Sequence, residues 1–125
     1  MFVDGGESEG FKLTPAKLKK AITAKTKALI LNSPSNPTGA AYSFDELKAL
    51  AEVLKGTEIL VISDDIYEKV VYDDFRFSNM ANVSEEMKEK TIVVNGLSKS
   101  HAMTGWRMGY AAGPASCEKR VLVAR

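Results

Sequence analysis

Side chains that could bind ligands or move protons follow three short apolar runs of this chain. The first run leads to Asn36, the second to Asp64 and Tyr67, and the third to Lys99. They offer an amide, a carboxylate, a phenol and an amine, groups suited to ligand binding and proton transfer. A lysine amine is also a nucleophile toward carbonyl groups. Each residue alone is more simply explained as a cap, a turn or a surface charge, so their order and spacing carry the information.

The three apolar runs indicate strands buried on both faces. They are continuous, and the second and third are rich in β-branched residues, which is typical of parallel strands covered by helices. The carboxyl ends of parallel strands meet at one edge of a sheet, where open α/β folds bind ligands. We therefore expect the polar residues to converge there. The predicted parallel strands lie near residues 28–33, 59–63 and 91–95.

A fourth, looser apolar run is predicted to be a strand over residues 107–112. It follows the third strand after a short link, which has room for one helical turn around Lys99. A parallel crossover needs a dozen or more residues and usually a helix. The fourth strand is therefore expected to return antiparallel to the third.

Helix-start signals lie between the runs. Thr14 is followed by Pro15, a hydroxyl cap with proline at the first helical position. Ser43 and Glu46 form a capping box before a helical apolar pattern, and Ser84 is a candidate cap for a shorter helix. The alternation predicts an α/β fold of three layers, a mainly parallel sheet with flanking helices, in one domain over residues 1–125.

Composition excludes several classes of partner. The 17 Lys and Arg residues nearly cancel the 16 Asp and Glu residues, so no charge excess favours nucleic acid or an anionic membrane. No apolar stretch approaches the ~20 residues that a membrane-spanning helix needs. The single cysteine, Cys117, cannot form an internal disulfide, which favours a reducing compartment. We therefore expect a cytoplasmic protein.

Three segments in this order resemble motifs of the class I and II aminotransferases, which depend on pyridoxal 5'-phosphate. Residues 96–109, GLSKSHAMTGWRMG, resemble the segment to which this family attaches its cofactor. Residues 36–39, NPTG, and 64–67, DDIY, resemble two motifs upstream of it. The chain is most similar to the bacterial aspartate aminotransferase branch. The resemblance implies part of the large, cofactor-binding domain.

The resemblance assigns the chemistry to Lys99 and Asp64. Lys99 would hold pyridoxal 5'-phosphate as a Schiff base, and its amine, once freed, would carry a proton between substrate and cofactor. The cofactor would act as the electron sink. Asp64, and not its neighbour Asp65, would lie beside the pyridine nitrogen and keep it protonated.

Three further roles follow from the same resemblance. Tyr67 and Asn36 would hydrogen-bond the phenolic oxygen of the cofactor and lower the pKa of the Schiff base, and the Asn36–Pro37 bond would be cis. Arg107 would bind the phosphate, for which a planar guanidinium is well suited. Many relatives have a serine on that phosphate where this chain has Gly96. That contact is therefore lost or comes from elsewhere.

The family implies a protein about three times this length, with two domains. Such an enzyme would exchange an amino group between an amino acid, aspartate-like by resemblance, and a 2-oxo acid, as a homodimer. An upstream phosphate-binding loop and a carboxylate-binding arginine have no counterpart within this chain. The chain alone is therefore expected to bind cofactor poorly and to be inactive.

Three alternative functions compete with this interpretation. A relative with the same fold could act as a lyase, or the chain could be a non-catalytic fragment. The apolar strand ending at Asp64 and Asp65 also resembles the magnesium-binding strand of nucleotide hydrolases. That class requires a phosphate loop of the form Gly-x-x-x-x-Gly-Lys-Ser/Thr, which this sequence lacks, so no metal site is predicted.

Overall fold

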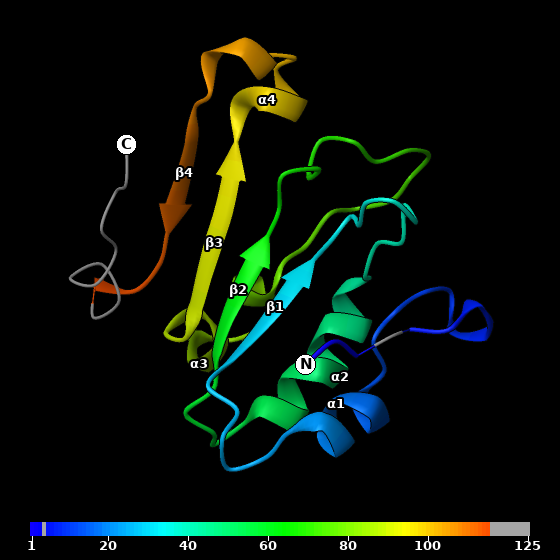
Figure 1. Cartoon of the computed structure of the whole chain (residues 1–125), viewed down its shortest axis with the longest axis vertical. Helices are drawn as coiled ribbons and strands as arrows, with labels where there is room; N and C mark the ends of the chain where they lie inside the picture. The colour runs from blue at the N-terminus through cyan, green and yellow to red at the C-terminus, as the bar shows by residue number, and fades with distance from the viewer. Residues whose placement is uncertain (4, 116–125) are drawn as a thin grey trace.

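Four strands form one mixed sheet in a computed structural model that describes residues 1–3 and 5–115 (Figure 1). The sheet order is β1-β2-β3-β4. β1 and β2 pair in parallel, as do β2 and β3, whereas β4 runs antiparallel beside β3. The three predicted parallel strands and the reversed fourth are confirmed. The strands are β1 (Ala28–Asn32), β2 (Leu60–Asp64), β3 (Thr91–Gly96) and β4 (Gly109–Ala112).

The strand bounds differ from the prediction most at β4, which begins at Gly109 and not at residue 107. Arg107 has a φ of 52°, in the left-handed region, which regular extended backbone does not adopt. Gly109 pairs with Gly96, so the segment between them forms the cap of a β3–β4 hairpin. That cap contains α4 (Leu97–Ser100) and the 3-10 helix η3 (Thr104–Trp106).

The predicted helix starts are confirmed. In α1 (Pro15–Ala21) the Thr14 hydroxyl accepts the Lys17 N–H at 3.4 Å. At the start of α2 (Phe44–Leu54), Ser43 and Glu46 cap each other's backbone N–H groups. Ser84 caps α3 (Glu85–Lys88), as expected. Two 3-10 helices, η1 (Glu7–Glu9) and η2 (Met80–Asn82), complete the described elements.

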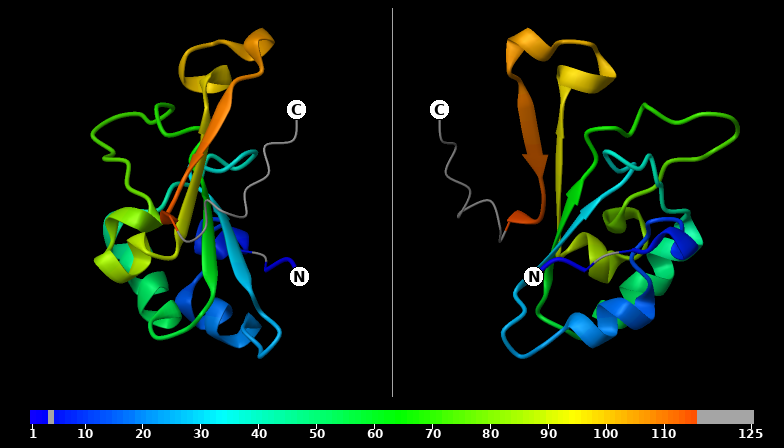
Figure 2. Two further views of the ribbon diagram at one scale, coloured as in Figure 1. Left: turned by 90° about the vertical axis from the view of Figure 1, so that its left-hand side faces the viewer. Right: turned by 45° about the vertical axis from the view of Figure 1, so that its right-hand side comes forward.

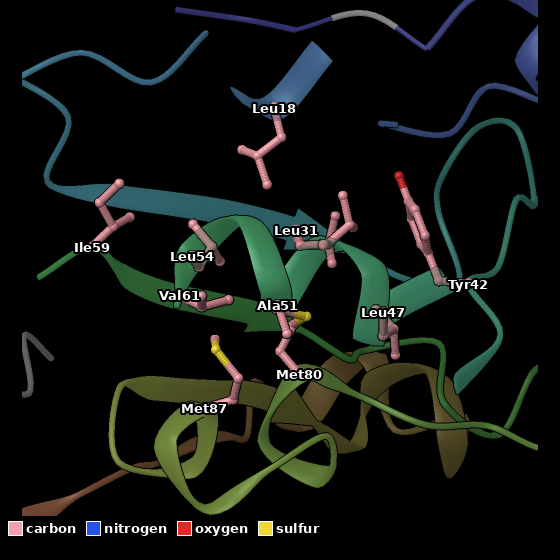
Figure 3. Close-up of a cluster of buried hydrophobic side chains, with 11 residues drawn as sticks. Leu18, Leu31, Tyr42, Leu47, Ala51, Leu54, Ile59, Val61, Met80 and Met87 are labelled. Atoms are coloured by element: carbon pink, nitrogen blue, oxygen red, sulfur yellow. The ribbon is translucent and has the colours of Figure 1, made fainter. Parts of the chain in front are cut away.

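One face of the sheet packs against α1, α2, α3 and η2 and forms the core (Figures 2 and 3). Side chains alternate along a strand, so every second residue of β2 faces these helices. Val61 and Ser63 are buried there, whereas Leu60 is exposed. The apolar core residues are Leu18, Leu31, Tyr42, Leu47, Leu50, Ala51, Leu54, Ile59, Val61, Met80 and Met87.

The other face of the sheet is bare in the described part of the chain. Ile30 of β1 is 70% exposed, and Leu60 and Val94 are also exposed. The mixed sheet with flanking helices is confirmed, and the three helices that pack on it form one layer (Figure 2). A second helical layer, which three layers would require, stays a prediction. No helix within the described residues is long and apolar enough to cross a membrane.

Candidate active site

The carboxyl ends of β1, β2 and β3 point to the same end of the sheet, as their arrowheads in Figure 1 show. The segments that follow these strands carry Asn36, Tyr67 and Lys99. Asp64 is itself the last residue of β2. The predicted convergence at one edge is therefore found.

Asn36 and Tyr67 are in direct contact. The Asn36 side-chain amide donates a hydrogen bond to the Tyr67 hydroxyl at 3.1 Å. Asn32 supports this pair, because its Oδ1 accepts the Asn36 backbone N–H and its amide donates to the Asp64 carbonyl oxygen. Sequence reasoning gave Asn32 no role. Its place as the last residue of β1, four positions before Asn36, was the available signal.

The bond between Asn36 and Pro37 is cis, as predicted. The bond between Ser33 and Pro34 is also cis, which was not predicted. Both belong to the loop that carries Asn36 to the sheet edge. Within it the Ser33 hydroxyl accepts the Tyr42 N–H at 3.2 Å, which ties the loop to the chain just before α2.

Lys99 lies in α4, the single helical turn expected after β3. Its Nζ is 5.6 Å from the centre of the Tyr67 ring, within the range of a cation–π contact. The side chain is exposed. Tyr67 therefore lies between the Asn36 amide and the Lys99 amine, so three of the predicted residues form one group.

Asp64 and Asp65 occupy opposite faces of the sheet. Asp64 shares the bare face with Leu60 and Ile62, and its Oδ1 accepts the Ile66 N–H at 3.3 Å. Asp65 is 1% exposed on the helix-covered face. Burial raises the pKa of Asp65 to about 6, although hydrogen bonds from Ser63 and Asn79 act in the opposite direction. The accessible carboxylate is thus Asp64, the one that the resemblance selects.

Arg107 follows η3 in the hairpin cap and is exposed. Its guanidinium donates to the Thr104 carbonyl oxygen at 3.2 Å. Within the described residues no hydrogen bond or ion pair joins Arg107 to Asn36, Tyr67 or Lys99. The phosphate role of Arg107 therefore stays a prediction.

The close approach of β3 and β4 explains why position 96 suits glycine here. A Cβ on Gly96 would lie 2.9 Å from the Met108 carbonyl oxygen and 3.2 Å from Ile66 Cδ1. The Leu97 N–H donates to that same carbonyl oxygen at 3.1 Å, so the backbone contact has a function. A serine there would force the two strands apart.

The residues present fit pyridoxal 5'-phosphate by their chemistry. An amine is available for the aldehyde, a carboxylate for the pyridine nitrogen, and a phenol with an amide for the phenolic oxygen. An open hollow of about 570 Å³ adjoins Tyr67, but its lining residues, which include Val70, Tyr72 and Phe75, do not include Asp64 or Lys99. This hollow is therefore separate from the carboxylate of Asp64 and the amine of Lys99.

Comparison with known proteins decides the family. The profile of the aminotransferase class I and II family matches residues 3–124. The chain belongs to this family. The aspartate aminotransferase of Geobacillus stearothermophilus is 54% identical over 114 residues, which cover 91% of this chain and 29% of that protein. This aminotransferase chain thus spans less than a third of the length of that relative.

Solved structures of the family have the same fold. The crystal structure of the aspartate aminotransferase from Rhizobium meliloti aligns with a TM-score of 0.88 and 49% identity, over 92% of this chain and 29% of that one. The aromatic aminotransferase from Pyrococcus horikoshii OT3 gives a TM-score of 0.88 and 45% identity, over 94% of this chain and 31% of that one. The mixed sheet is therefore that of a family large domain. Cys117, whose expected role was that of a free thiol, lies outside the described residues.

Proposed function

We propose that this chain is the segment of a pyridoxal-phosphate-dependent aminotransferase that carries the attachment lysine, Lys99. The observation that carries the proposal is the group at the sheet edge, where Tyr67 contacts the Asn36 amide at 3.1 Å and its ring lies 5.6 Å from Lys99 Nζ. These residues come from three segments of the chain, each of which follows a different parallel strand. On this proposal residues 1–125 are a partial large domain.

Each residue has a task that its environment suits. The Lys99 amine would hold the cofactor through its aldehyde and, when free, would carry a proton. Asp64 lies on the bare face, where its carboxylate can pair with a protonated pyridine nitrogen. Tyr67, whose hydroxyl accepts a hydrogen bond from Asn36, would place that hydroxyl near the phenolic oxygen. Arg107 would bind the phosphate by a bidentate contact. Bound, the cofactor supplies the electron sink.

The proposed reaction transfers an amino group between an amino acid and a 2-oxo acid. Aspartate is the proposed amino donor, because relatives at about half identity carry the name aspartate aminotransferase. An aromatic amino acid is the second candidate donor, because one of the similar solved structures is that of an aromatic aminotransferase. We further propose a homodimer for the whole protein. Borohydride reduction of the protein with pyridoxal 5'-phosphate, followed by peptide mapping, tests the central assignment.

The expected result of this trapping is one pyridoxyl mark, on Lys99. Lys12 is one internal control, because its amine is already paired with Glu46 at 2.9 Å. Lys55, which follows the last residue of α2, is a second control. A mark on Lys12 or Lys55 in place of Lys99 would overturn the assignment. Tight stoichiometric binding by the 125-residue chain alone would contradict the expectation that it holds cofactor poorly.

A further inference from the structure

Asp65 is a buried carboxyl group to which the proposed function gives no task. The residue is 1% exposed, and the charged groups acting on it, Asp64 and Glu68, are both acidic. A carboxyl group is seldom kept in such a place without hydrogen-bond partners, because the loss of hydration is costly. Its partners therefore indicate what it does.

Those partners join two distant parts of the chain. The Ser63 hydroxyl donates to Asp65 Oδ1 at 2.7 Å, and the Asn79 amide donates to Oδ2 at 2.6 Å. Asn79 also accepts the Asn82 N–H at 3.2 Å and so caps η2. We call Ser63, Asp65 and Asn79 the Asp65 clasp. It connects the end of β2 to the start of η2, 14 residues further along the chain.

The segment that the clasp closes, residues 66–78, carries Tyr67 and contains no helix or strand. Its first turn is anchored on the backbone of Asp65, whose N–H donates to the Val94 carbonyl oxygen and whose carbonyl oxygen accepts the Glu68 N–H, both at 2.9 Å. A loop without regular structure is ordered by contacts at its ends, since ordering it costs conformational entropy. The clasp supplies a contact at both ends.

We infer that Asp65 is a positioning residue, whose carboxylate clasps both ends of the 66–78 segment and thereby holds the Tyr67 hydroxyl against Asn36. The inference rests on the proposed function, because Tyr67 matters to the reaction only if it meets the cofactor. It assigns adjacent carboxylates to different tasks on the two faces of one strand end.

Four variants of the whole protein separate positioning from general stability. Asp65→Ala and Asn79→Ala each break the clasp and leave its other members unpaired. Asp65→Asn keeps one oxygen for the Asn79 amide and offers an amide to the Ser63 oxygen, so it should rescue the clasp. Leu54→Ala is the control, because Leu54 is fully buried in the core and takes no part in the hydrogen bonds of the clasp.

Limited trypsin digestion reads the order of the segment without any cofactor. Lys69 and Arg76 are exposed cleavage sites within residues 66–78. Asp65→Ala and Asn79→Ala should speed cleavage at both sites roughly tenfold, as expected when local opening no longer has to break the clasp. Asp65→Asn should be cleaved at nearly the parental rate. Cleavage rates are compared at a temperature where Leu54→Ala is folded.

The absorbance of bound pyridoxal 5'-phosphate across pH reads the position of Tyr67. Tyr67→Phe removes the hydrogen bond to the phenolic oxygen and should raise the pH midpoint of the colour change. Asp65→Ala should move the midpoint in the same direction by about half a unit or more, and Leu54→Ala should not move it. In the double variant with Tyr67→Phe, Asp65→Ala should add no further shift.

Two results would overturn the inference. One is cleavage in Asp65→Ala no faster than in Leu54→Ala, which would mean that the clasp does not hold the segment. The other is faster cleavage with an unmoved colour midpoint, which would mean that the segment is held but Tyr67 is not positioned by it. A parent protein that binds no cofactor would overturn the proposed function instead, and digestion would still decide whether the clasp orders the segment.

Discussion

The two faces of the sheet give the acidic residues at the end of β2 different surroundings. On the helix-covered face Asp65 is enclosed, and its oxygens accept hydrogen bonds from Ser63 and Asn79. On the bare face Asp64 keeps its carboxylate on the same side of β2 as the exposed Leu60. Adjacent residues of extended backbone point to opposite faces, so one acidic pair places one carboxylate in the scaffold and the other where we propose the chemistry. The covered face builds the scaffold, and the bare face carries Asp64, the carboxylate that we propose for the chemistry.

The largest expected difference between the faces concerns activity. In the whole protein, Asp64→Asn should lower kcat on the order of a thousandfold, because an amide cannot stabilise a pyridinium charge. Cofactor affinity should fall much less. Asp65→Asn is the matched control on the other face and should change kcat by less than about threefold, since hydrogen-bonding capacity is largely kept. Steady-state kinetics with a cofactor titration measures both. Normal turnover in Asp64→Asn would mean that another carboxylate is responsible.

The next effect concerns stability of the 125-residue chain. Leu54→Ala, at a fully buried core position, should cost about 3 kcal/mol of unfolding free energy. Ile30→Ala, at a side chain 70% exposed on the bare face, should cost less than about 1 kcal/mol. Urea unfolding of the two variants gives the comparison. Equal costs would contradict the division between a covered and a bare face.

The buried carboxyl group predicts a pH dependence of stability. The pKa of Asp65 rises from 3.8 to about 6 on folding, so the folded state holds this proton more tightly than the unfolded state does. The contribution of this proton to the free energy of unfolding is fully present below pH ~4. It is lost as the pH rises to about 6, which lowers the free energy of unfolding by up to about 3 kcal/mol. Asp65→Asn removes this titration. Subtracting its unfolding free energies from those of the parent across pH isolates the effect, and a flat difference would refute the shift.

Glu46 should show the opposite pH dependence of stability in the same experiment. Hydrogen bonds and charge from Lys12 and Ser43 lower its pKa even though burial, the largest influence, raises it. Its stabilisation is therefore present above the unfolded pKa and is lost as pH falls through the lowered value. A parallel Glu46→Gln series separates the two groups.

The smallest effect tests the hairpin that carries Lys99. Gly96→Ser restores the serine of many relatives but places a Cβ 2.9 Å from the Met108 carbonyl oxygen. It should destabilise the protein by about 2 kcal/mol, as overpacking against backbone does. Gly105→Ser is the control, because a Cβ there meets no atom within 4 Å. Cofactor affinity measured alongside shows whether the new hydroxyl adds a contact with the phosphate that offsets the lost stability. A Gly96→Ser protein as stable as the parent would mean that β4 shifts at little cost to make room for the side chain.

The sequence predicted best what is decided locally. The caps at Thr14 and Ser43 act within four residues, and both helices begin where those caps place them. The hairpin reversal followed from a short link. The predicted start of β4 was wrong because Arg107 adopts a left-handed conformation. That conformation favours glycine, and the sequence has arginine at this position, so it gave no signal of the turn.

The features that were missed depend on side chains that are distant in sequence. Phe44 fits the apolar pattern of its helix yet is 46% exposed. Asn32 bridges to Asp64 over 32 residues, and Asp65 reaches Asn79 over 14. Such pairs depend on strand register, which periodicity does not specify. The residues of the candidate site were found because a family resemblance, and not spacing alone, supplied their roles.

The hairpin of β3 and β4 also bears on the order in which the site assembles. The parallel pairs bring together residues about 30 positions apart, so each must close a long loop before its contacts form. The hairpin closes over residues 97–108 and its pairing is local. Local pairs form in microseconds, whereas distant parallel pairs are slow. Lys99 is therefore carried on a unit that can fold early and meet Tyr67 only when β2 and β3 align. The rate at which Lys99 and Tyr67 come together is therefore set by the pairing of β2 with β3.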